Sequence, residues 1–227
     1  MRGEARTRRR GAAVGVMARA PSSGGKTRLA AHLSAPRLAA LRTALLADTL
    51  RLVAALPDLV PVVFFTPSDG WPEIAALAER SLAAVPQAEG DLGERLGAAC
   101  RHLLADREHA ILIGTDMPML TADHIADALT TLRTDGGVVL GPADDGGYYL
   151  IGMSAEYPGV FDGIAWGGNR VLSDTLGAAD RLGVQARLIR GGYDVDTIDD
   201  LRRLERDLAD APPNMAPHVR EWFSEGR

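Results

Sequence analysis

A short polar segment near the start of the chain, Pro21-Ser-Ser-Gly-Gly-Lys-Thr-Arg28, has the composition of a phosphate-binding turn. It lies between an expected strand and a helical pattern that begins near Thr27, where backbone N–H groups and the helix dipole favour an anion. The phosphate loop of ATPases is disfavoured, because its first glycine would stand where this chain has Ala20. We predict a looser turn, the alternative being a solvated loop with two surface cations. The predicted nucleotide-binding residues are Pro21, Gly24, Gly25, Lys26 and Arg28.

A single carboxylate, Asp116, directly follows an apolar run in the segment Gly114-Thr-Asp-Met-Pro118. Proteins bind Mg²⁺ through one or two carboxylates, and substrate phosphate oxygens complete the coordination. We therefore predict that Asp116 binds Mg²⁺ or Mn²⁺ and that Asp116 and Lys26 are catalytic. The alternative is that Asp116 only hydrogen-bonds to the turn before the helix that Thr121 begins.

The most distinctive stretch is Gly141-Pro-Ala-Asp-Asp-Gly-Gly-Tyr-Tyr-Leu150. Two carboxylates followed by two glycines form a turn where atoms of another molecule can approach the backbone closely. One of the two tyrosines would pack against a base or sugar, and the other would lie in the core. The alternative is a plain acidic hairpin. The residues predicted here for an acceptor or donor pocket are Asp144, Asp145, Gly146, Gly147 and Tyr148.

Two more segments could complete such a pocket. In Tyr193-Asp-Val-Asp-Thr197, alternating side chains of an extended chain point to opposite sides, so only one aspartate faces the ion. We assign Asp194 to the metal, and Asp196 to the pocket rim beside the start of the next helix, which favours an anion. Trp166 is flanked by glycines, and it either forms a wall of the acceptor pocket or fills the core.

Two polar residues on apolar helix faces have structural explanations. Asp48 is in register with leucines, and a buried carboxylate must be paired or hydrogen-bonded, so we expect an arginine or backbone partner. Cys100 is also in register with leucines, which favours a core thiol over a nucleophile. As the only cysteine, Cys100 excludes an internal disulfide and is typical of a reducing compartment, so we expect a cytoplasmic protein.

Apolar runs alternate with helical patterns along the whole chain, which predicts a three-layer α/β/α fold with a mostly parallel central sheet. Expected strands cover residues 12–18, 59–66, 82–85, 109–114, 137–140, 148–153 and 185–190, with helices over 38–56, 72–80, 91–105, 121–132, 170–182 and 198–208. Ligands of such sheets bind outside the carboxyl ends of the strands. The loops at 19–26, 115–119, 141–147 and 191–197 should therefore meet at one edge, with Lys26 and Asp116 on a common rim.

The charge distribution sets further bounds. The chain carries a net charge of −5, and residues 1–10, with five arginines and one glutamate, contribute +4, so the remainder is at −9. An acidic body argues against nucleic acid and suits divalent cations. No apolar run approaches the roughly 18 residues of a membrane span. We predict a disordered basic leader at residues 1–11, a single domain at 12–210 and a C-terminal tail at 211–227 that docks on the body through its apolar residues.

Four of these motifs occur together in one known family. Lys26–Leu29, Gly114–Pro118, Gly141–Gly152 and Asp194–Thr197 resemble the glycosyltransferase-like family described as radical-SAM/selenodomain-associated transferases or arsenosugar-biosynthesis glycosyltransferases. The likeness spans residues 13–208, with the motifs in the expected order. That family lies within the nucleotide-diphospho-sugar transferase superfamily, of the GT-A fold, with relatives such as molybdenum-cofactor guanylyltransferase and 2-phospho-L-lactate guanylyltransferase.

The resemblance implies a nucleotide held by the first loop and a Mg²⁺ or Mn²⁺ ion bound through Asp116. We expect a metal-dependent transferase that takes a nucleotide-sugar donor and a small-molecule acceptor, in which a nucleoside diphosphate leaves. The alternative is nucleotidyl transfer of the guanylyltransferase type, in which an acceptor phosphate attacks the α-phosphorus and pyrophosphate leaves. A second alternative is a catalytically inactive nucleotide-binding module. No nucleic acid or membrane partner is expected, and a homodimer is compatible with the sequence.

Overall fold

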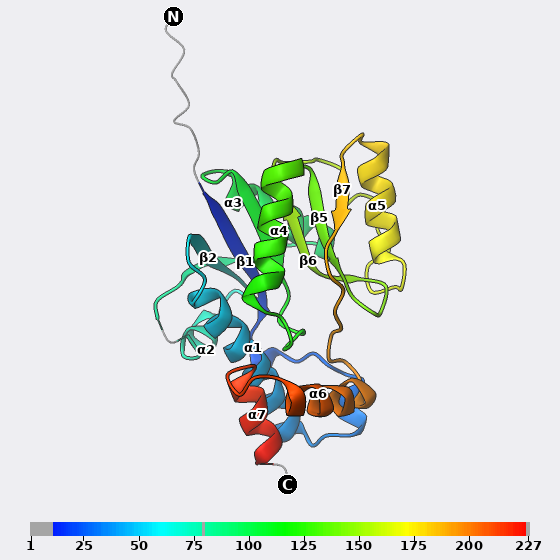
Figure 1. The fold of residues 1–227 in the computed structure, drawn as a ribbon. Coiled ribbons are helices and arrows are strands. Elements are labelled where there is room, and N and C mark those ends of the chain that lie inside the picture. The colour runs from blue at the N-terminus through cyan, green and yellow to red at the C-terminus, as the bar shows by residue number, and fades with distance from the viewer. Residues whose placement is uncertain (1–10, 79, 226–227) are drawn as a thin grey trace, which may run out of the picture.

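The computed structural model of this 227-residue chain describes residues 11–78 and 80–225, so the predicted leader lies outside the described residues apart from Gly11. Within that part, seven strands form one sheet in the order β3-β2-β1-β4-β6-β5-β7 (Figure 1). β6 is antiparallel to its neighbours β4 and β5, and the other pairs are parallel. The strands are β1 (Ala12–Arg19), β2 (Leu59–Thr66), β3 (Ala83–Pro86), β4 (His109–Ile113), β5 (Val138–Pro142), β6 (Tyr148–Met153) and β7 (Ala186–Leu188). The mostly parallel sheet predicted from the sequence is confirmed.

Helices cover both faces of this sheet. The helices are α1 (Ala35–Ala54), α2 (Trp71–Ala75), α3 (Leu92–Leu104), α4 (Ala122–Asp135), α5 (Val171–Arg181), α6 (Ile198–Asp210) and α7 (Pro217–Ser224). The carboxyl half of α1 packs with α2 and α4 in one apolar cluster, and α3 packs with α5 in a second cluster across the sheet. The three-layer α/β/α architecture is therefore confirmed.

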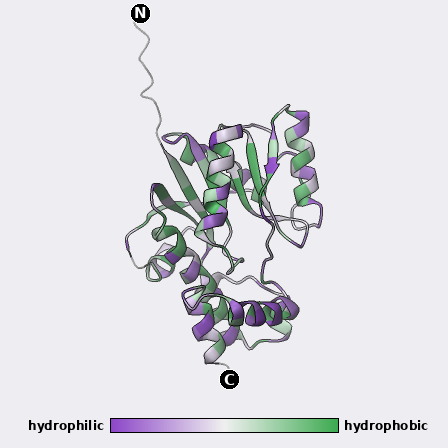
Figure 2. Ribbon diagram, in the orientation of Figure 1, coloured by the Kyte–Doolittle hydropathy of each residue, from purple (hydrophilic) through white to green (hydrophobic). Residues whose placement is uncertain are grey.

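The central strand β1 is buried on both sides. Val14 and Val16 belong to the first cluster and Ala13 to the second, as expected of a parallel strand between two helix layers. A Cβ atom at Gly15 would lie 2.5 Å from a methyl carbon of Leu112 and 2.8 Å from a ring carbon of Phe64, so glycine leaves room for these two side chains over β1. Figure 2 shows the apolar residues along the strands and mainly hydrophilic residues along α6.

A third apolar cluster lies beyond the carboxyl edge of the sheet, where α6 and α7 pack on the first half of α1 (Figure 1). Asp48 of α1 accepts hydrogen bonds from the backbone N–H groups of His218 (3.1 Å) and Val219 (3.0 Å) at the start of α7. The predicted backbone partner of Asp48 is thus confirmed. The indole N–H of Trp222 donates to the carbonyl of Arg37 at 3.0 Å, so the C-terminal helix is fixed to α1 at both of its ends.

One expected element is wrong. The helix predicted to begin near Thr27 begins at Ala35, because Ser34 caps it by accepting a hydrogen bond from the N–H of Arg37. The preceding turn is incompatible with a helix, since φ is +95° at Gly24, +109° at Gly25 and +54° at Lys26. The helix-dipole argument for an anion at this turn is therefore withdrawn.

The other structural expectations concern burial. Cys100 is buried in the second apolar cluster, and burial raises the pKa of its thiol to about 12, which confirms the core assignment. No helix within residues 11–78 and 80–225 is long and apolar enough to cross a membrane.

Candidate functional site

Two adjoining cavities lie at the carboxyl edge of the sheet. The larger, about 460 Å³, is called here the arginine cavity because Arg19, Arg42 and Arg95 line it. The smaller, about 380 Å³, is called the tryptophan cavity because Trp166 forms part of its wall. The residues common to both linings are Lys26, Leu92, Tyr148, Asp194 and Asp196. The sequence-predicted loops therefore meet at one edge.

Lys26 is the centre of this junction. Its side chain is only 6% exposed, and its ammonium group donates to the carbonyl of Val195 at 2.6 Å and lies 2.7 Å from Asp116 Oδ1 and 3.2 Å from Asp196 Oδ1. Burial alone would lower the pKa of Lys26, but the two carboxylates outweigh it and raise the pKa above its ordinary value. The predicted common rim of Lys26 and Asp116 is confirmed. All three ammonium N–H donors already have acceptors.

Asp194 is the most perturbed carboxyl group in the site. Burial and the nearby carboxylates of Asp116, Asp145 and Asp196 raise its pKa to about 7, although the charge of Lys26 acts in the opposite direction. Like charges that share a partly buried site disfavour ionisation of one another. The arrangement therefore favours a cation between these carboxylates.

The expectation that Asp194 and Asp196 point to opposite sides is wrong, because both line both cavities. Residues 193–197 have no regular strand geometry, so the alternation rule does not apply to them. The start of α6 is occupied by Asp200 instead, whose carboxylate accepts from the N–H groups of Asp196 (3.0 Å) and Thr197 (2.7 Å). The carboxylate of Asp196 is left to pair with Lys26.

The two carboxylates of the acidic turn after β5, Asp144 and Asp145, have different surroundings. Asp145 and Gly147 line the tryptophan cavity, as predicted. Asp144 does not line either cavity, because its carboxylate pairs with Arg203 of α6 at 2.6 Å. Gly146 also stays outside both linings; its φ is +89°, and a Cβ atom there would lie 2.0 Å from the carbonyl oxygen of Asn169, so the turn requires glycine at this position.

The sequence predicted that one of the two tyrosines lies in the core and the other borders the ligand pocket. Tyr149 is buried, its hydroxyl donates to the carbonyl of Arg190 at 2.8 Å, and it borders only the arginine cavity, whereas Tyr148 lines both cavities and also packs against the second apolar cluster. Trp166 lines the tryptophan cavity and also packs on Phe161 with ring centroids 6.2 Å apart. Trp166 therefore borders a cavity and also packs against the core, and its role as a wall of an acceptor pocket stays a prediction.

The residues of the predicted nucleotide-binding turn do not all line the same cavity. Gly24, Gly25 and Lys26 line the arginine cavity, and Arg28 lines the tryptophan cavity. Pro21 is buried at the start of a short 3-10 turn (Pro21–Ser23) and does not line either cavity, so the structure does not bring it together with the other predicted site residues.

The residues of the arginine cavity that were missed from the sequence include three arginines and an amide: Arg19, Arg42, Arg95 and Gln87. Gln87 follows β3, and its amide N–H₂ donates to the carbonyls of Ala18 (3.1 Å) and Phe64 (2.9 Å), while its oxygen accepts from Arg95 at 3.4 Å. Arg42 donates to the carbonyl of Gly25 at 3.1 Å and so supports the glycine turn from α1. Gln87 stands at a strand end, a signal that the carboxyl-edge rule could have used.

Comparison with known proteins identifies the family. The sequence pattern of the family described as "Uncharacterized protein conserved in bacteria (DUF2064)" matches residues 49–168, more than half of the chain. The chain belongs to this family. The matched segment contains Asp116, the acidic turn and Trp166, while Lys26 and Asp194 lie on either side of it. A search of curated proteins gave no match.

Solved structures share the fold. A protein from Desulfovibrio desulfuricans G20 that carries the provisional name nucleotide-diphospho-sugar transferase is 27% identical, with a TM-score of 0.85 over 94% of this chain and 95% of that one. A 4-diphosphocytidyl-2C-methyl-D-erythritol synthase is 12% identical (TM-score 0.60; 89% and 100% covered). A CMP:2-keto-3-deoxy-manno-octonic acid synthetase complexed with CTP is 13% identical (TM-score 0.53; 88% and 99% covered). The chain therefore has the fold of nucleotide-diphospho-sugar transferases and cytidylyltransferases.

The donor set of the site determines which ions it could hold. Within residues 11–78 and 80–225, no three His, Cys, Asp or Glu side chains gather into a ready-made metal site. The carboxylates of Asp116 and Asp194 are close enough for mutual repulsion, and both supply hard oxygen ligands. One or two carboxylates completed by phosphate oxygens and water fit Mg²⁺ or Mn²⁺, whereas a zinc site with only protein ligands does not fit.

Proposed function

We propose that this protein is a metal-dependent transferase that uses a nucleotide-sugar donor. One observation carries the proposal: a buried lysine joins Asp116 and Asp196 where a cavity rich in arginine meets a cavity with acidic and aromatic walls. The likeness to the Desulfovibrio protein, whose provisional name is of this class, supports it.

The arginine cavity is proposed to hold the nucleotide. Gln87 Oε1 and the guanidinium of Arg95 place an acceptor beside a donor, a pattern that can hydrogen-bond to the edge of a base. Because Lys26 already has three acceptors, the phosphate charge falls to Arg19, Arg42 and Arg28. Lys26 instead holds Asp116 and Asp196 in place and keeps a positive charge near the leaving phosphates.

Asp116 and Asp194 are proposed to hold Mg²⁺ or Mn²⁺, which when bound would neutralise the diphosphate that leaves. The chain's own contribution is to orient these groups. The Asp116 carbonyl accepts from the N–H of Val195 at 2.8 Å, so the loop after β4 and the segment before α6 are joined by backbone as well as by Lys26.

The tryptophan cavity is proposed to take the sugar and the acceptor. The face of Trp166 offers an apolar surface for a ring, and Asp145, Asp194 and Asp196 can accept hydrogen bonds from hydroxyl groups. We prefer glycosyl transfer to nucleotidyl transfer because of the provisional name of the Desulfovibrio protein. The narrower resemblance to arsenosugar-biosynthesis glycosyltransferases stays a prediction, as does the cytoplasmic location.

The second candidate is nucleotidyl transfer from a nucleoside triphosphate. Arg19, Arg28, Arg42 and Arg95 supply more positive charge than a diphosphate needs, and the fold is also that of the cytidylyltransferases named above. The third candidate is an inactive nucleotide-binding module. The acidic cluster argues against it, because mutual repulsion of the carboxylates lowers the stability of the protein, and a module with no function for these carboxylates would have no reason to keep them.

Product analysis separates the three candidates. The full-length chain is incubated with Mg²⁺ and either each nucleoside triphosphate or a panel of nucleotide-sugars, with small polyols as acceptors, and released nucleoside diphosphate and pyrophosphate are quantified. We expect nucleoside diphosphate from a nucleotide-sugar. Pyrophosphate from a triphosphate alone would favour the second candidate. Nucleotide binding without either product would leave the inactive module.

A further inference from the structure

The acidic turn after β5 and the segment before α6 behave as one unit. The N–H of Gly192 donates to the carbonyl of Pro142 at 2.9 Å, and the N–H of Asp144 donates to the carbonyl of Gly192 at 3.0 Å. Ala143 and Gly192 form an isolated parallel bridge. The unit places Asp145 from one segment and Asp194 from the other on the wall of the tryptophan cavity.

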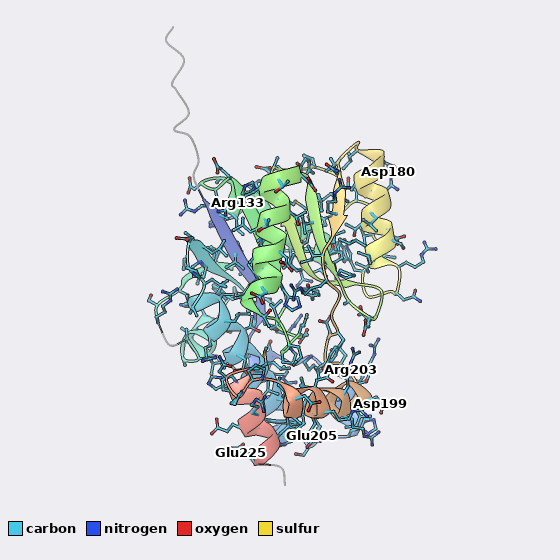
Figure 3. The ribbon with its side chains drawn as sticks, viewed as in Figure 1. Arg133, Asp180, Asp199, Arg203, Glu205 and Glu225 are labelled. Carbon is cyan, nitrogen blue, oxygen red and sulfur yellow. The ribbon has the colours of Figure 1, made fainter. Side chains whose placement is uncertain are left out.

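Arg203 of α6 contacts both halves of this unit from outside the cavities. Its guanidinium carbon lies 3.7 Å from the ring centroid of Tyr193, and its Nη1 lies 2.6 Å from Asp144 Oδ2. The same guanidinium lies 3.7 Å from Asp207, which accepts a hydrogen bond of 2.7 Å from the Tyr193 hydroxyl. In Figure 3, Arg203 is labelled on the side of α6 that faces the segment descending from β7.

The unit needs such a contact for two reasons. Residues 193–197 lack regular strand pairing, and the Val195 N–H bond to the Asp116 carbonyl holds one point of the segment, so side-chain contacts contribute to its position. The cavity side also carries several carboxylates, and Asp144 adds another negative charge next to Asp145. Lys26 fixes the segment from the cavity side through the Val195 carbonyl, and Arg203 fixes it from the opposite side while neutralising Asp144.

We propose that Arg203 is a positioning residue, which joins the two acidic segments through Asp144 and Tyr193 and so sets the spacing of Asp145 and Asp194. Its ion pair with Asp144 is exposed and would contribute little by itself. The effect comes instead from the combined contact, in which one flat guanidinium stacks on a ring from one segment and pairs with a carboxylate from the other. Lysine has the charge but cannot make the flat contact. The relevance of this spacing to catalysis rests on the proposed function, but the positioning itself does not.

Helix α6 offers a matched control. Arg202 is adjacent to Arg203, is 69% exposed and pairs with Asp199 of the same helix at 2.9 Å, so its loss removes one arginine and one surface ion pair without touching either acidic segment. The comparison set is Arg203→Ala, Arg203→Lys, Arg202→Ala and Asp144→Asn, all in the full-length chain.

The first measurement is hydrogen exchange of peptides covering residues 141–147 and 191–197, where the N–H groups of Asp144 and Gly192 report the pairing of the segments. We expect Arg203→Ala to accelerate exchange about fivefold or more there, which is within the range of couplings between contacting residues. Arg203→Lys and Asp144→Asn should give smaller accelerations, and Arg202→Ala none. Equal exchange in Arg203→Ala and Arg202→Ala would overturn the proposal.

The second measurement is the Mg²⁺ concentration that half-saturates nucleotide binding. It should rise several-fold in Arg203→Ala and stay unchanged in Arg202→Ala. If Arg203→Ala unfolds, the Asp144→Asn variant decides: faster exchange in both segments supports the positioning role, and exchange as in the wild type overturns it. Faster exchange in Arg203→Ala together with no metal-dependent binding in the wild type would support the positioning role and contradict the proposed function.

Discussion

The arginine cavity and the tryptophan cavity share a wall but differ in charge and in the elements that build them. The arginine cavity is lined by α1, α3, the ends of strands β1, β2, β3 and β4 and the glycine turn, and it contains four cations (Lys26 and three arginines) against three aspartates. The tryptophan cavity is lined mainly by loops around β5, β6 and α5, and it contains two cations (Lys26 and Arg28) against three aspartates, together with an indole. The side with the excess of cations suits a charged nucleotide, and the side with the excess of carboxylates and an indole suits a hydroxylated ring.

The wall that the two cavities share is built by contacts between residues far apart in the sequence. Lys26 and Asp196 line both cavities, and Asp116 lines the arginine cavity beside them; the three residues come from separate loops and are joined by the ion pairs of Lys26. A change at the wall should therefore disable both cavities, whereas a change in one cavity should affect one substrate only.

The largest effect is expected for Asp116→Asn, which removes a partner of buried Lys26 and a proposed metal ligand. Turnover should fall by about a hundredfold or more, comparable to the loss of one preorganised charge-stabilising group. The check is steady-state kinetics at saturating Mg²⁺, with Asp180→Asn as control, since Asp180 is exposed at the far end of α5 (Figure 3). Wild-type turnover in Asp116→Asn would refute the shared-wall account.

A smaller and one-sided effect is expected for Arg95→Ala. Without the donor beside Gln87, the KM for the nucleotide donor should rise about tenfold, or about 1.4 kcal/mol, with kcat and the acceptor KM little changed. Arg101→Ala, on the same helix, removes an exposed arginine that pairs with Glu156 and should have no such effect. An equal rise in both KM values would show that the two cavities are not specialised.

The opposite one-sided effect is expected for Trp166→Phe, which keeps an apolar ring packed near Phe161 but reduces the stacking surface. Acceptor affinity should fall about three- to tenfold, in line with the value of one aromatic contact, while nucleotide affinity stays the same. Titration of each substrate separately measures this. A loss confined to the nucleotide would reverse the assignment of the cavities.

The smallest change is a gain in stability. In metal-free buffer at pH 8, Asp194→Asn removes a buried carboxylate that faces Asp116, Asp145 and Asp196, so the free energy of unfolding should rise by about 1–3 kcal/mol. For a chain of this length the midpoint of thermal unfolding should rise by roughly 2–4 °C per kcal/mol. Added Mg²⁺ should stabilise the wild type more than the variant. A less stable variant would mean that the charge of Asp194 is compensated within the protein.

Much of the fold and the meeting of the loops could be predicted, because both follow from local patterns. Strand and helix periodicities predict the layers, and the rule for the carboxyl edge predicts that Lys26 and Asp116 approach. The helix expected at Thr27 failed because the apolar pattern ran across a turn whose positive φ angles no periodicity records.

The remaining errors depend on partners distant in sequence. Asp144 and Asp145 are adjacent and chemically identical, and only the pairing with Arg203, fifty-nine residues away, turns Asp144 from the cavity. Likewise, Arg42 and Arg95 reach the site from helices, where the direction of a side chain depends on how each helix packs. Residue type and spacing do not contain that information.

The most direct test of the shared wall is thermal unfolding of the wild type with nucleoside diphosphates, with and without Mg²⁺. The account predicts that nucleotide and metal together raise the midpoint well beyond the sum of their separate effects, and that Asp116→Asn abolishes this excess. Stabilisation by nucleotide that is the same with and without metal in both proteins would contradict it.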